Sequence, residues 1–184
     1  MPHPCGTRSF TTIADSRVEH RKRDEILDKF KLVEAEGRIA PCQVAVVMSN
    51  YNSNIVDRLL QGCLKTLHAA GIANNAITVV KVPGAVEIPV MAREIAVTVK
   101  PDAIITLGAI IRGETPHFDI IAQTCSDGVT RVALDYGLPV IFGVLTVDNF
   151  SQAQDRAGDA ESNKGSEAAQ AAVEMISVIR KIRA

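Results

Sequence analysis

Short runs of apolar and β-branched residues alternate with helix-like periods four times between residue 43 and the end of the sequence. The runs predicted to be strands are "QVAVVM" (43–48), "ITVVKV" (77–82), "AIITLGA" (103–109) and "PVIFGVL" (139–145). Each is apolar at successive positions, which is typical of strands that helices cover on both faces. The alternation predicts an α/β protein, namely a three-layer α/β/α sandwich around a four-stranded parallel sheet.

The predicted helices follow from apolar spacing and from capping residues. The first is marked by apolar side chains at every fourth position: Ile55, Leu59, Cys63 and Leu67. We expect Ser53 or Asn54 to cap this helix and Gly71 to end it. The further helices are expected over 88–96, from Thr115, from a cap at Asp148 to Gly158, and from Lys164 onward.

The composition fits one ordinary domain with a sizeable core, since 47% of the 184 residues are hydrophobic. A net charge of −1 gives no electrostatic case for a nucleic-acid or membrane-surface partner, and no apolar run approaches the roughly 18 residues of a membrane span. The scattered cysteines, which form no CxxC pair, argue against a disulfide framework or a zinc site. They are Cys5, Cys42, Cys63 and Cys125. Such usage favours a reducing compartment, so we expect a cytoplasmic protein.

The first 30 residues differ from the rest. Residues 1–20 are polar, with no acidic residue before Asp15, which faintly resembles a transit peptide. The next stretch, "RKRDEILDKFK" (21–31), alternates in charge sign as a solvated helix or tail does. We therefore expect residues 1–30 to be a flexible extension and residues 31–184 to form the folded domain.

Ligands of such sheets bind beyond the carboxyl ends of the strands, so the loops after the strands are where chemistry is expected. These loops are "SNYNSN" (49–54), "PGAVE" (83–87), "IIRGETPH" (110–117) and "TVDN" (146–149), and "DRAGDAESNKG" (155–165) adds a further polar segment. "GDAESNKG" is not a P-loop, because Asn163 replaces its second glycine and Gly165 its Ser/Thr. No GxGxxG follows a strand, so a dinucleotide cofactor is not expected, and no Ser/His/Asp nucleophile elbow is present.

The third loop has the features of an anion site. Thr115 is a good N-cap and Pro116 a preferred first helical residue, so free N–H groups and the positive end of a helix dipole would converge there. Gly113 would let a ligand approach the backbone closely. A well-capped helix without a ligand is the plainer alternative. His117 falls in the first turn, where an imidazole could exchange protons near neutral pH.

Other polar residues of these loops have more than one possible role. Arg112 could bind a ligand, but we favour a salt bridge that braces its loop, with Glu114 facing outward and contributing only its backbone. Tyr51 could stack on a planar heterocycle or simply anchor its loop. Glu87 could accept hydrogen bonds from a ligand hydroxyl or favour a helix dipole. Arg156 could bind phosphate, although an ordinary surface arginine is the commoner case.

Four blocks, in order and at similar spacing, carry a resemblance to a known family: "VPGAVEIPV" (82–90), "TLGAIIRGETPHFDII" (106–121), "PVIFGVLTVDN" (139–149) and "DRAG…NKGSEAAQAAVEM" (155–175). From about Lys31 onward the chain resembles the 6,7-dimethyl-8-ribityllumazine synthases of riboflavin biosynthesis. The resemblance implies a flavodoxin-like topology. It also implies a transferase that joins 5-amino-6-(D-ribitylamino)uracil to 3,4-dihydroxy-2-butanone 4-phosphate, releases phosphate and water, and needs no metal and no redox cofactor.

The resemblance further implies a site shared between subunits. Tyr51 would stack on the pyrimidine, Glu87 would hold ribityl hydroxyls and His117 would shuttle protons. Lining and backbone contacts are implied for Ala85, Val86, Ala109, Ile110 and Ile111, and phosphate contacts for the amides of Gly113, Glu114 and Thr115. From a neighbouring subunit, Phe142 would pack on the ring, Arg156 would grip the phosphate and Lys164 would meet the ribityl chain.

The assembly implied by the resemblance is a homopentamer, and in some members twelve pentamers form a hollow icosahedral shell. The segment near Leu32–Ile39 would pair with the sheet of the adjacent subunit, and the short link 158–163 favours the shell. Two positions depart from the family, because Tyr51 stands where Phe or Trp is commoner and Ser162 where glycine is common. The alternative functions are a non-catalytic flavin- or lumazine-binding protein or cage, and an FMN carrier, which the 4% aromatic content argues against.

Overall fold

The computed structural model describes residues 29–37, 39, 41–158 and 163–184. The chain divides into two units, Met1–Glu34 and Ala35–Ala184, and each is considered by itself. Most of the predicted N-terminal extension lies outside the described residues, as do Cys5 and Ser162. The domain boundary at residue 31 stays a prediction.

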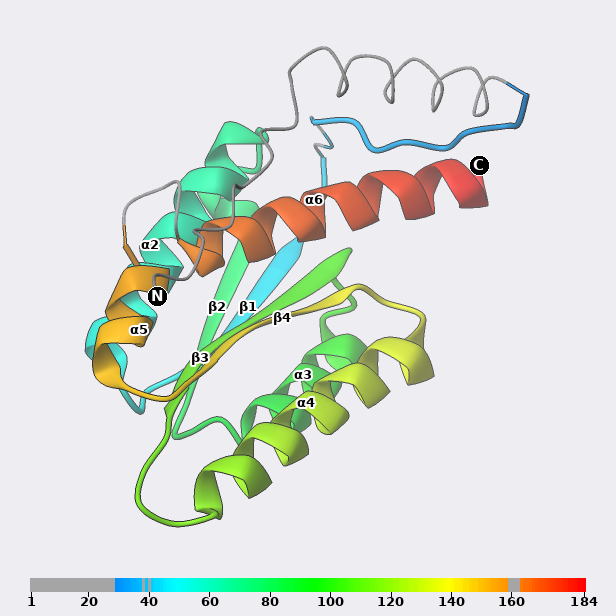
Figure 1. Ribbon diagram of the computed structural model, residues 1–184. Coiled ribbons are helices and arrows are strands. Elements are labelled where there is room, and N and C mark those ends of the chain that lie inside the picture. Colours follow the sequence, from blue (N-terminus) through cyan, green and yellow to red (C-terminus); the bar gives the residue numbers. More distant parts are fainter. Residues whose placement is uncertain (1–28, 38, 40, 159–162) are drawn as a thin grey trace, which may run out of the picture. The chain divides into compact units, whose positions relative to one another are not determined.

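Strands and helices of the second unit alternate along the chain (Figure 1). The elements are β1 (Val44–Ser49), α2 (Ser53–Ala69), the short 3-10 helix η1 (Asn74–Ala76), β2 (Ile77–Val82), α3 (Ile88–Thr98), β3 (Ala103–Ile111), α4 (His117–Tyr136), β4 (Val140–Val147), α5 (Phe150–Arg156) and α6 (Lys164–Arg183). Each predicted strand is present, to within two residues at either end. No helix in the described part of the chain is long and apolar enough to cross a membrane.

The four strands form one sheet in the order β2-β1-β3-β4, and every neighbouring pair is parallel. Val46 in β1 pairs with Val79 on one side and Ile105 on the other. This confirms the predicted parallel sheet with flavodoxin-like strand order. Because all strands run the same way, their carboxyl ends meet at one edge of the sheet.

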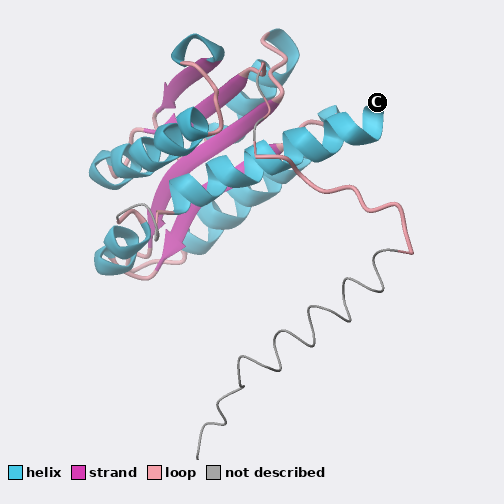
Figure 2. Cartoon of the chain, turned by 90° about the horizontal axis from the view of Figure 1, so that it is seen from above, coloured by secondary structure: helices cyan, strands magenta, loops and turns pink. Residues whose placement is uncertain are grey.

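Helices cover both faces of the sheet, which confirms the three-layer α/β/α architecture (Figures 1 and 2). Along β1, Val44, Val46 and Met48 point into the core formed with α2, α5 and α6. Ala45 and Val47 point into the opposite core, formed with α3 and α4. A strand that alternates between two apolar layers must be apolar at every position, which explains the continuous apolar runs.

The helices cover the two edge strands less completely than the two central strands. β1 is buried throughout and β3 nearly so, whereas Val79 of β2 is 43% exposed and Phe142 of β4 is 39% exposed. The reason is the strand order, because β2 and β4 each have a neighbour on one side only. The edge strands therefore carry more apolar surface than a single chain buries.

The predicted caps of α4 and α5 are wrong. α4 begins at His117 with Pro116 in the cap position, so Thr115 lies in the preceding loop. α5 is capped by Asn149, whose side-chain oxygen accepts a hydrogen bond from the Gln152 N–H at 2.9 Å, and not by Asp148. α5 ends at Arg156, two residues before the predicted end. Residue type and spacing alone do not specify which of two neighbouring residues takes the cap position.

Candidate active site

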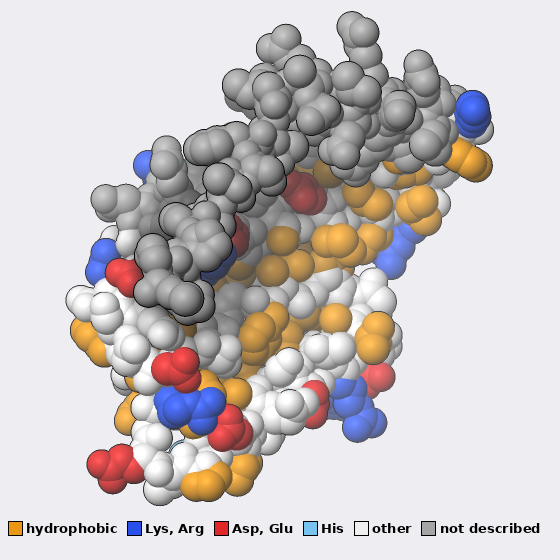
Figure 3. All heavy atoms as spheres, viewed as in Figure 1, with side chains coloured by type: hydrophobic (Ala, Val, Ile, Leu, Met, Phe, Trp, Pro, Cys, Tyr) orange, Lys and Arg blue, Asp and Glu red, His pale blue; other side chains and the backbone are white. Residues whose placement is uncertain are grey.

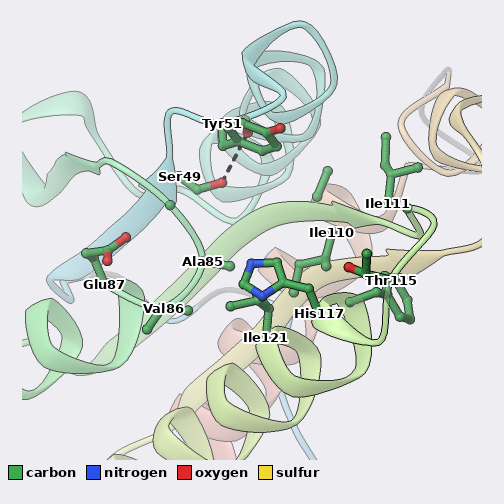
Figure 4. Close-up of a pocket in the computed structure, with 14 residues that line it drawn as sticks. Ser49, Tyr51, Ala85, Val86, Glu87, Ile110, Ile111, Thr115, His117 and Ile121 are labelled. Atoms are coloured by element: carbon green, nitrogen blue, oxygen red, sulfur yellow. Dashed lines mark hydrogen bonds between the residues drawn. The ribbon is translucent and has the colours of Figure 1, made fainter.

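A cavity of about 400 Å³ opens at the carboxyl ends of β1 and β3 (Figure 4). Its walls come from the β1–α2 loop, the β2–α3 loop, the end of β3 and the first turn of α4. The lining residues are Ser49, Tyr51, Gly84, Ala85, Val86, Glu87, Ala109, Ile110, Ile111, Gly113, Thr115, His117, Phe118 and Ile121. We refer to this space as the first cavity. It lies at the edge of the sheet where strand direction predicts a ligand site.

Most of the predicted site residues therefore come together in the first cavity. The structure brings together Tyr51, Ala85, Val86, Glu87, Ala109, Ile110, Ile111, Gly113, Thr115 and His117. Glu114 lies in the same loop but is exposed and does not line the cavity, as expected for a side chain that faces outward.

Tyr51 is held at the mouth of the first cavity by its backbone. Its N–H donates to the carbonyl oxygen of Pro83 at 3.1 Å, and the N–H of Asn50 donates to Val82 at 2.7 Å. The hydroxyl of the buried Ser49 donates to the carbonyl oxygen of Tyr51 at 3.4 Å (Figure 4). These bonds tie the loop to the end of β2 and leave the side chain 72% exposed. An aromatic side chain fixed in this way can offer a face to a planar ligand.

Asn52 occupies the N-cap position of α2 in the left-handed backbone region, with φ 56° and ψ 40°. The predicted caps, Ser53 and Asn54, are instead the first two helical residues. The side chain of Asn52 makes no capping hydrogen bond, and its Nδ2 donates to the carbonyl oxygen of Ala109 at 2.8 Å. Asn52 thus joins the loop that carries Tyr51 to the end of β3.

The β3–α4 loop presents open backbone donors. The N–H of Arg112 donates to Val147 at 2.9 Å and ends the pairing of β3 with β4. Within the described residues, the N–H groups of Gly113, Glu114 and Thr115 have no hydrogen-bond partner. A Cβ placed on Gly113 would meet no atom within 4 Å, so the space beside this backbone is open. Consecutive free amides at the start of a helix favour a bound anion.

His117 is the first residue of α4 and is exposed. Its ring points from the helix toward Ala85 and Val86, with Ile121 beneath it (Figure 4). No hydrogen bond to either ring nitrogen is present in the described part of the chain, so both nitrogens are open to a ligand. A neutral imidazole with both nitrogens accessible can accept a proton at one atom and donate from the other.

Glu87 stands on the other side of the first cavity from His117, with Ala85 and Val86 between them (Figure 4). It occupies the cap position of α3 without a capping hydrogen bond. Its carboxylate folds back over Gly84, because a Cβ there would lie 3.1 Å from Oε2. The carboxylate is exposed and can accept hydrogen bonds from ligand hydroxyls.

Some lining residues were missed by the sequence analysis. Ser49, Gly84, Phe118 and Ile121 line the first cavity but were not predicted to do so. Ile121 lies four residues after His117 and therefore shares its face of α4. That spacing could have identified it.

Arg112 braces the β3–α4 loop, which confirms the favoured role. Its Nε donates to Asp148 Oδ1 at 3.0 Å, and Nη1 and Nη2 each donate to the Asp119 carboxylate at 3.1 Å. The hydrogen bonds that the guanidinium donates to Asp119, and then to Asp148, raise its pKa, so it keeps its charge. The guanidinium carbon lies 4.1 Å from the centre of the Phe118 ring.

Phe142, Arg156 and Lys164 lie apart from the first cavity. They line a second cavity of about 370 Å³ between the edge strand β4 and the helices α5 and α6, and none of them lines the first cavity. Hydrophobic side chains gather along this edge, between α6 and α4 (Figure 3). Lys164 pairs with Glu167 at 2.7 Å, and Nη1 of Arg156 donates to the carbonyl oxygen of Gln152 at 3.1 Å.

A comparison with models of known protein families shows to which family the chain belongs. The family model described as 6,7-dimethyl-8-ribityllumazine synthase matches residues 41–180. The match spans all four strands and both cavities. This is a family of transferases in riboflavin biosynthesis. The chain belongs to the 6,7-dimethyl-8-ribityllumazine synthase family.

Proposed function

We propose that the protein condenses 5-amino-6-(D-ribitylamino)uracil with 3,4-dihydroxy-2-butanone 4-phosphate to give 6,7-dimethyl-8-ribityllumazine, phosphate and water. The observation that carries the proposal is the placement of His117 directly beside the open amides of Gly113 and Thr115 in one cavity. A group that moves protons thus lies next to donors suited to a phosphate. Family membership supports the identity of the substrates.

The first cavity offers a different surface to each part of the substrates. The phosphate accepts hydrogen bonds from the amides of residues 113–115, and each such bond to a charged group contributes about 1.5–3 kcal/mol. The pyrimidine lies against Tyr51 and the apolar wall that contains Ile110. The ribityl hydroxyls donate to Glu87 on the far side.

The chemistry needs several proton transfers at one place. The 5-amino group attacks the ketone and water leaves to form an imine. A proton then comes off carbon as phosphate departs, and the resulting enol becomes a ketone. The ribitylamino nitrogen attacks that carbonyl, and a second water leaves as the ring closes. His117 accepts and returns these protons, a role that typically contributes about 10²–10⁴-fold in rate. The rest of the acceleration comes from holding two substrates together, for which effective molarities can reach about 10⁵ M or more.

The proposed site is completed by a second copy of the chain. Phe142, Arg156 and Lys164 carry the remaining predicted contacts, and they line a different cavity of the same chain. The apolar edge strand β4 next to them is available for burial against another copy. A head-to-tail ring brings the second cavity of one subunit to the first cavity of the next. We propose a homopentamer, with the segment Leu32–Ile39 pairing with the adjacent sheet and the icosahedral shell as its larger form.

The test is to mix the purified protein with both substrates and follow the absorbance of the lumazine. We expect turnover well above the uncatalysed rate, and a loss of about 10²–10⁴-fold in kcat for His117→Ala. His68→Ala is the matched control, because His68 is exposed, pairs with Asn74 at 2.7 Å and lines neither cavity. Wild-type rates equal to the uncatalysed background would exclude the enzyme. Lumazine binding without turnover would then support the non-catalytic binding protein.

A further inference from the structure

Arg112 joins the two ends of the β3–α4 loop. At its start, the backbone N–H of Arg112 is fixed to the sheet through Val147 at 2.9 Å. At its end, the Arg112 side chain returns to the first turn of α4 and holds both oxygens of Asp119 at 3.1 Å. The remaining guanidinium nitrogen, Nε, donates a hydrogen bond to Asp148 at 3.0 Å, and the Phe118 side chain lies against the guanidinium. Residues 113–118 are thus held at both ends by one residue.

The segment 113–118, which these contacts enclose, contains the residues that the proposed reaction uses. Gly113 and Thr115 carry open amides, and His117 carries the open imidazole. Arg112, Asp119 and Asp148 do not themselves line the first cavity. Any effect of Arg112 on a ligand in the first cavity therefore passes through the loop.

We propose that Arg112 is a positioning residue, which sets the directions of the 113–115 amides and of the His117 ring toward a phosphate-bearing substrate. The inference rests on the proposed function for the identity of that substrate. The ion pairs of Arg112 are about half exposed, so they contribute little to overall stability. Their effect is on geometry, because misplacement of binding groups by about 1 Å can cost 10²-fold in rate. Only a planar guanidinium can bond two carboxylates and stack on a ring at once.

A purely electrostatic role for Arg112 and a positioning role predict opposite effects of Asp119→Asn on phosphate binding. If Arg112 only attracted phosphate by its charge, Asp119→Asn would remove a nearby negative charge and strengthen phosphate binding. If Arg112 positions the loop, Asp119→Asn weakens phosphate binding, because the paired hydrogen bonds between Arg112 and the Asp119 carboxylate are lost. The sign of the change separates the two roles.

The experiment titrates inorganic phosphate into the full-length chain and its variants by calorimetry. We expect Arg112→Ala and Asp119→Asn each to weaken phosphate binding about tenfold, which corresponds to about 1.4 kcal/mol. Arg112→Lys keeps the charge but does not restore affinity. Arg131→Ala is the matched control and leaves affinity unchanged, since Arg131 forms a similarly exposed ion pair, with Asp135 at 3.4 Å, but lies within α4 and not in the β3–α4 loop.

Three results would overturn the positioning role. The first is that Asp119→Asn binds phosphate as tightly as the wild type or more tightly. The second is that Arg112→Lys keeps the wild-type affinity for phosphate, and the third is that the wild-type chain binds no phosphate. In the lumazine assay we also expect the KM for the butanone phosphate to rise in Arg112→Ala, while the KM for the pyrimidine stays unchanged. The phosphate titration needs no turnover, so it decides the role of Arg112 even if the proposed reaction fails.

Discussion

The side-chain nitrogen of Asn52 donates a hydrogen bond to the carbonyl oxygen of Ala109, with 2.8 Å between the two atoms. This bond connects the β1–α2 loop to the end of β3, where Ala109 lines the first cavity. Asn52 has φ 56°, and asparagine is one of the few residues that tolerate this backbone region. One side chain thus provides both the turn and the connection.

Replacing Asn52 separates these two contributions. We expect Asn52→Ala to lower the free energy of unfolding by about 1–3 kcal/mol, because alanine loses the hydrogen bond and is strained at positive φ. Asn52→Gly loses only the bond and should cost less, about 0.5–1.5 kcal/mol. Urea unfolding followed by circular dichroism measures both. Equal losses in the two variants would show that the backbone strain is not significant.

Two glycines offer a contrast between function and packing. In Gly113→Ala the new methyl group meets no protein atom within 4 Å and no positive φ is involved. We expect its stability to stay within about 0.5 kcal/mol of wild type, as for most surface changes, while phosphate binding weakens because the methyl group lies beside the open amides. Calorimetric titration and urea unfolding measure the two effects. Unchanged phosphate affinity would count against a phosphate at this loop.

Gly165 should behave in the opposite way. It lies near the start of α6, and a Cβ there would collide with the backbone carbonyl of Leu59 in α2. We expect Gly165→Ala to lower the free energy of unfolding by about 1–3 kcal/mol, the usual cost of overpacking. The same urea unfolding experiment measures it, and a stability equal to that of Gly113→Ala would contradict the close packing of α2 on α6.

The buried thiols of Cys63 and Cys125 predict a loss of stability at high pH. Burial raises the pKa of Cys63 to about 12 and that of Cys125 to about 11. An unfolded thiol ionises near pH 8.5, so above that pH the unfolded chain binds fewer protons than the folded chain. The stabilisation by the neutral thiols is complete below about pH 8.5 and is lost as the pH rises toward these folded values.

We therefore expect the free energy of unfolding to fall above about pH 9, by up to about 1.4 kcal/mol per pH unit for each thiol. Because lysines and tyrosines also titrate there, the useful measurement is the difference between the wild type and the double variant Cys63→Ala, Cys125→Ala. The pH profile of the double variant should be flatter. Parallel profiles would show that these thiols do not ionise on unfolding.

The sequence analysis was most successful where one physical cause acts alone. β1 and β3 are apolar at nearly every position because two helix layers cover them, so their runs predicted buried strands correctly. The same pattern was misleading for Val79 and Phe142, because a run of apolar residues does not distinguish a covered strand from an edge strand. Strand order depends on contacts between distant segments, which local patterns do not contain.

The site was predictable in its location but not in its construction. Loops after parallel strands indicated the first cavity, and Arg112 was expected to brace its loop. The role of Asn52 was missed, because its bond partner Ala109 is 57 residues away. Thr115 and Asp148 were misassigned as caps, because α4 and α5 each begin one residue later than expected, after Pro116 and Asn149.

The central claim is that one active site contains His117 from one chain and Arg156 from another. Co-expressing His117→Ala and Arg156→Ala chains tests it, because each variant alone lacks one group in every site. In mixed rings assembled at random, about a quarter of the sites regain both groups. The shared site predicts lumazine formation at about a quarter of the wild-type rate in the mixture, against strongly reduced rates for either variant alone. A mixture no more active than the average of the two variants would contradict it.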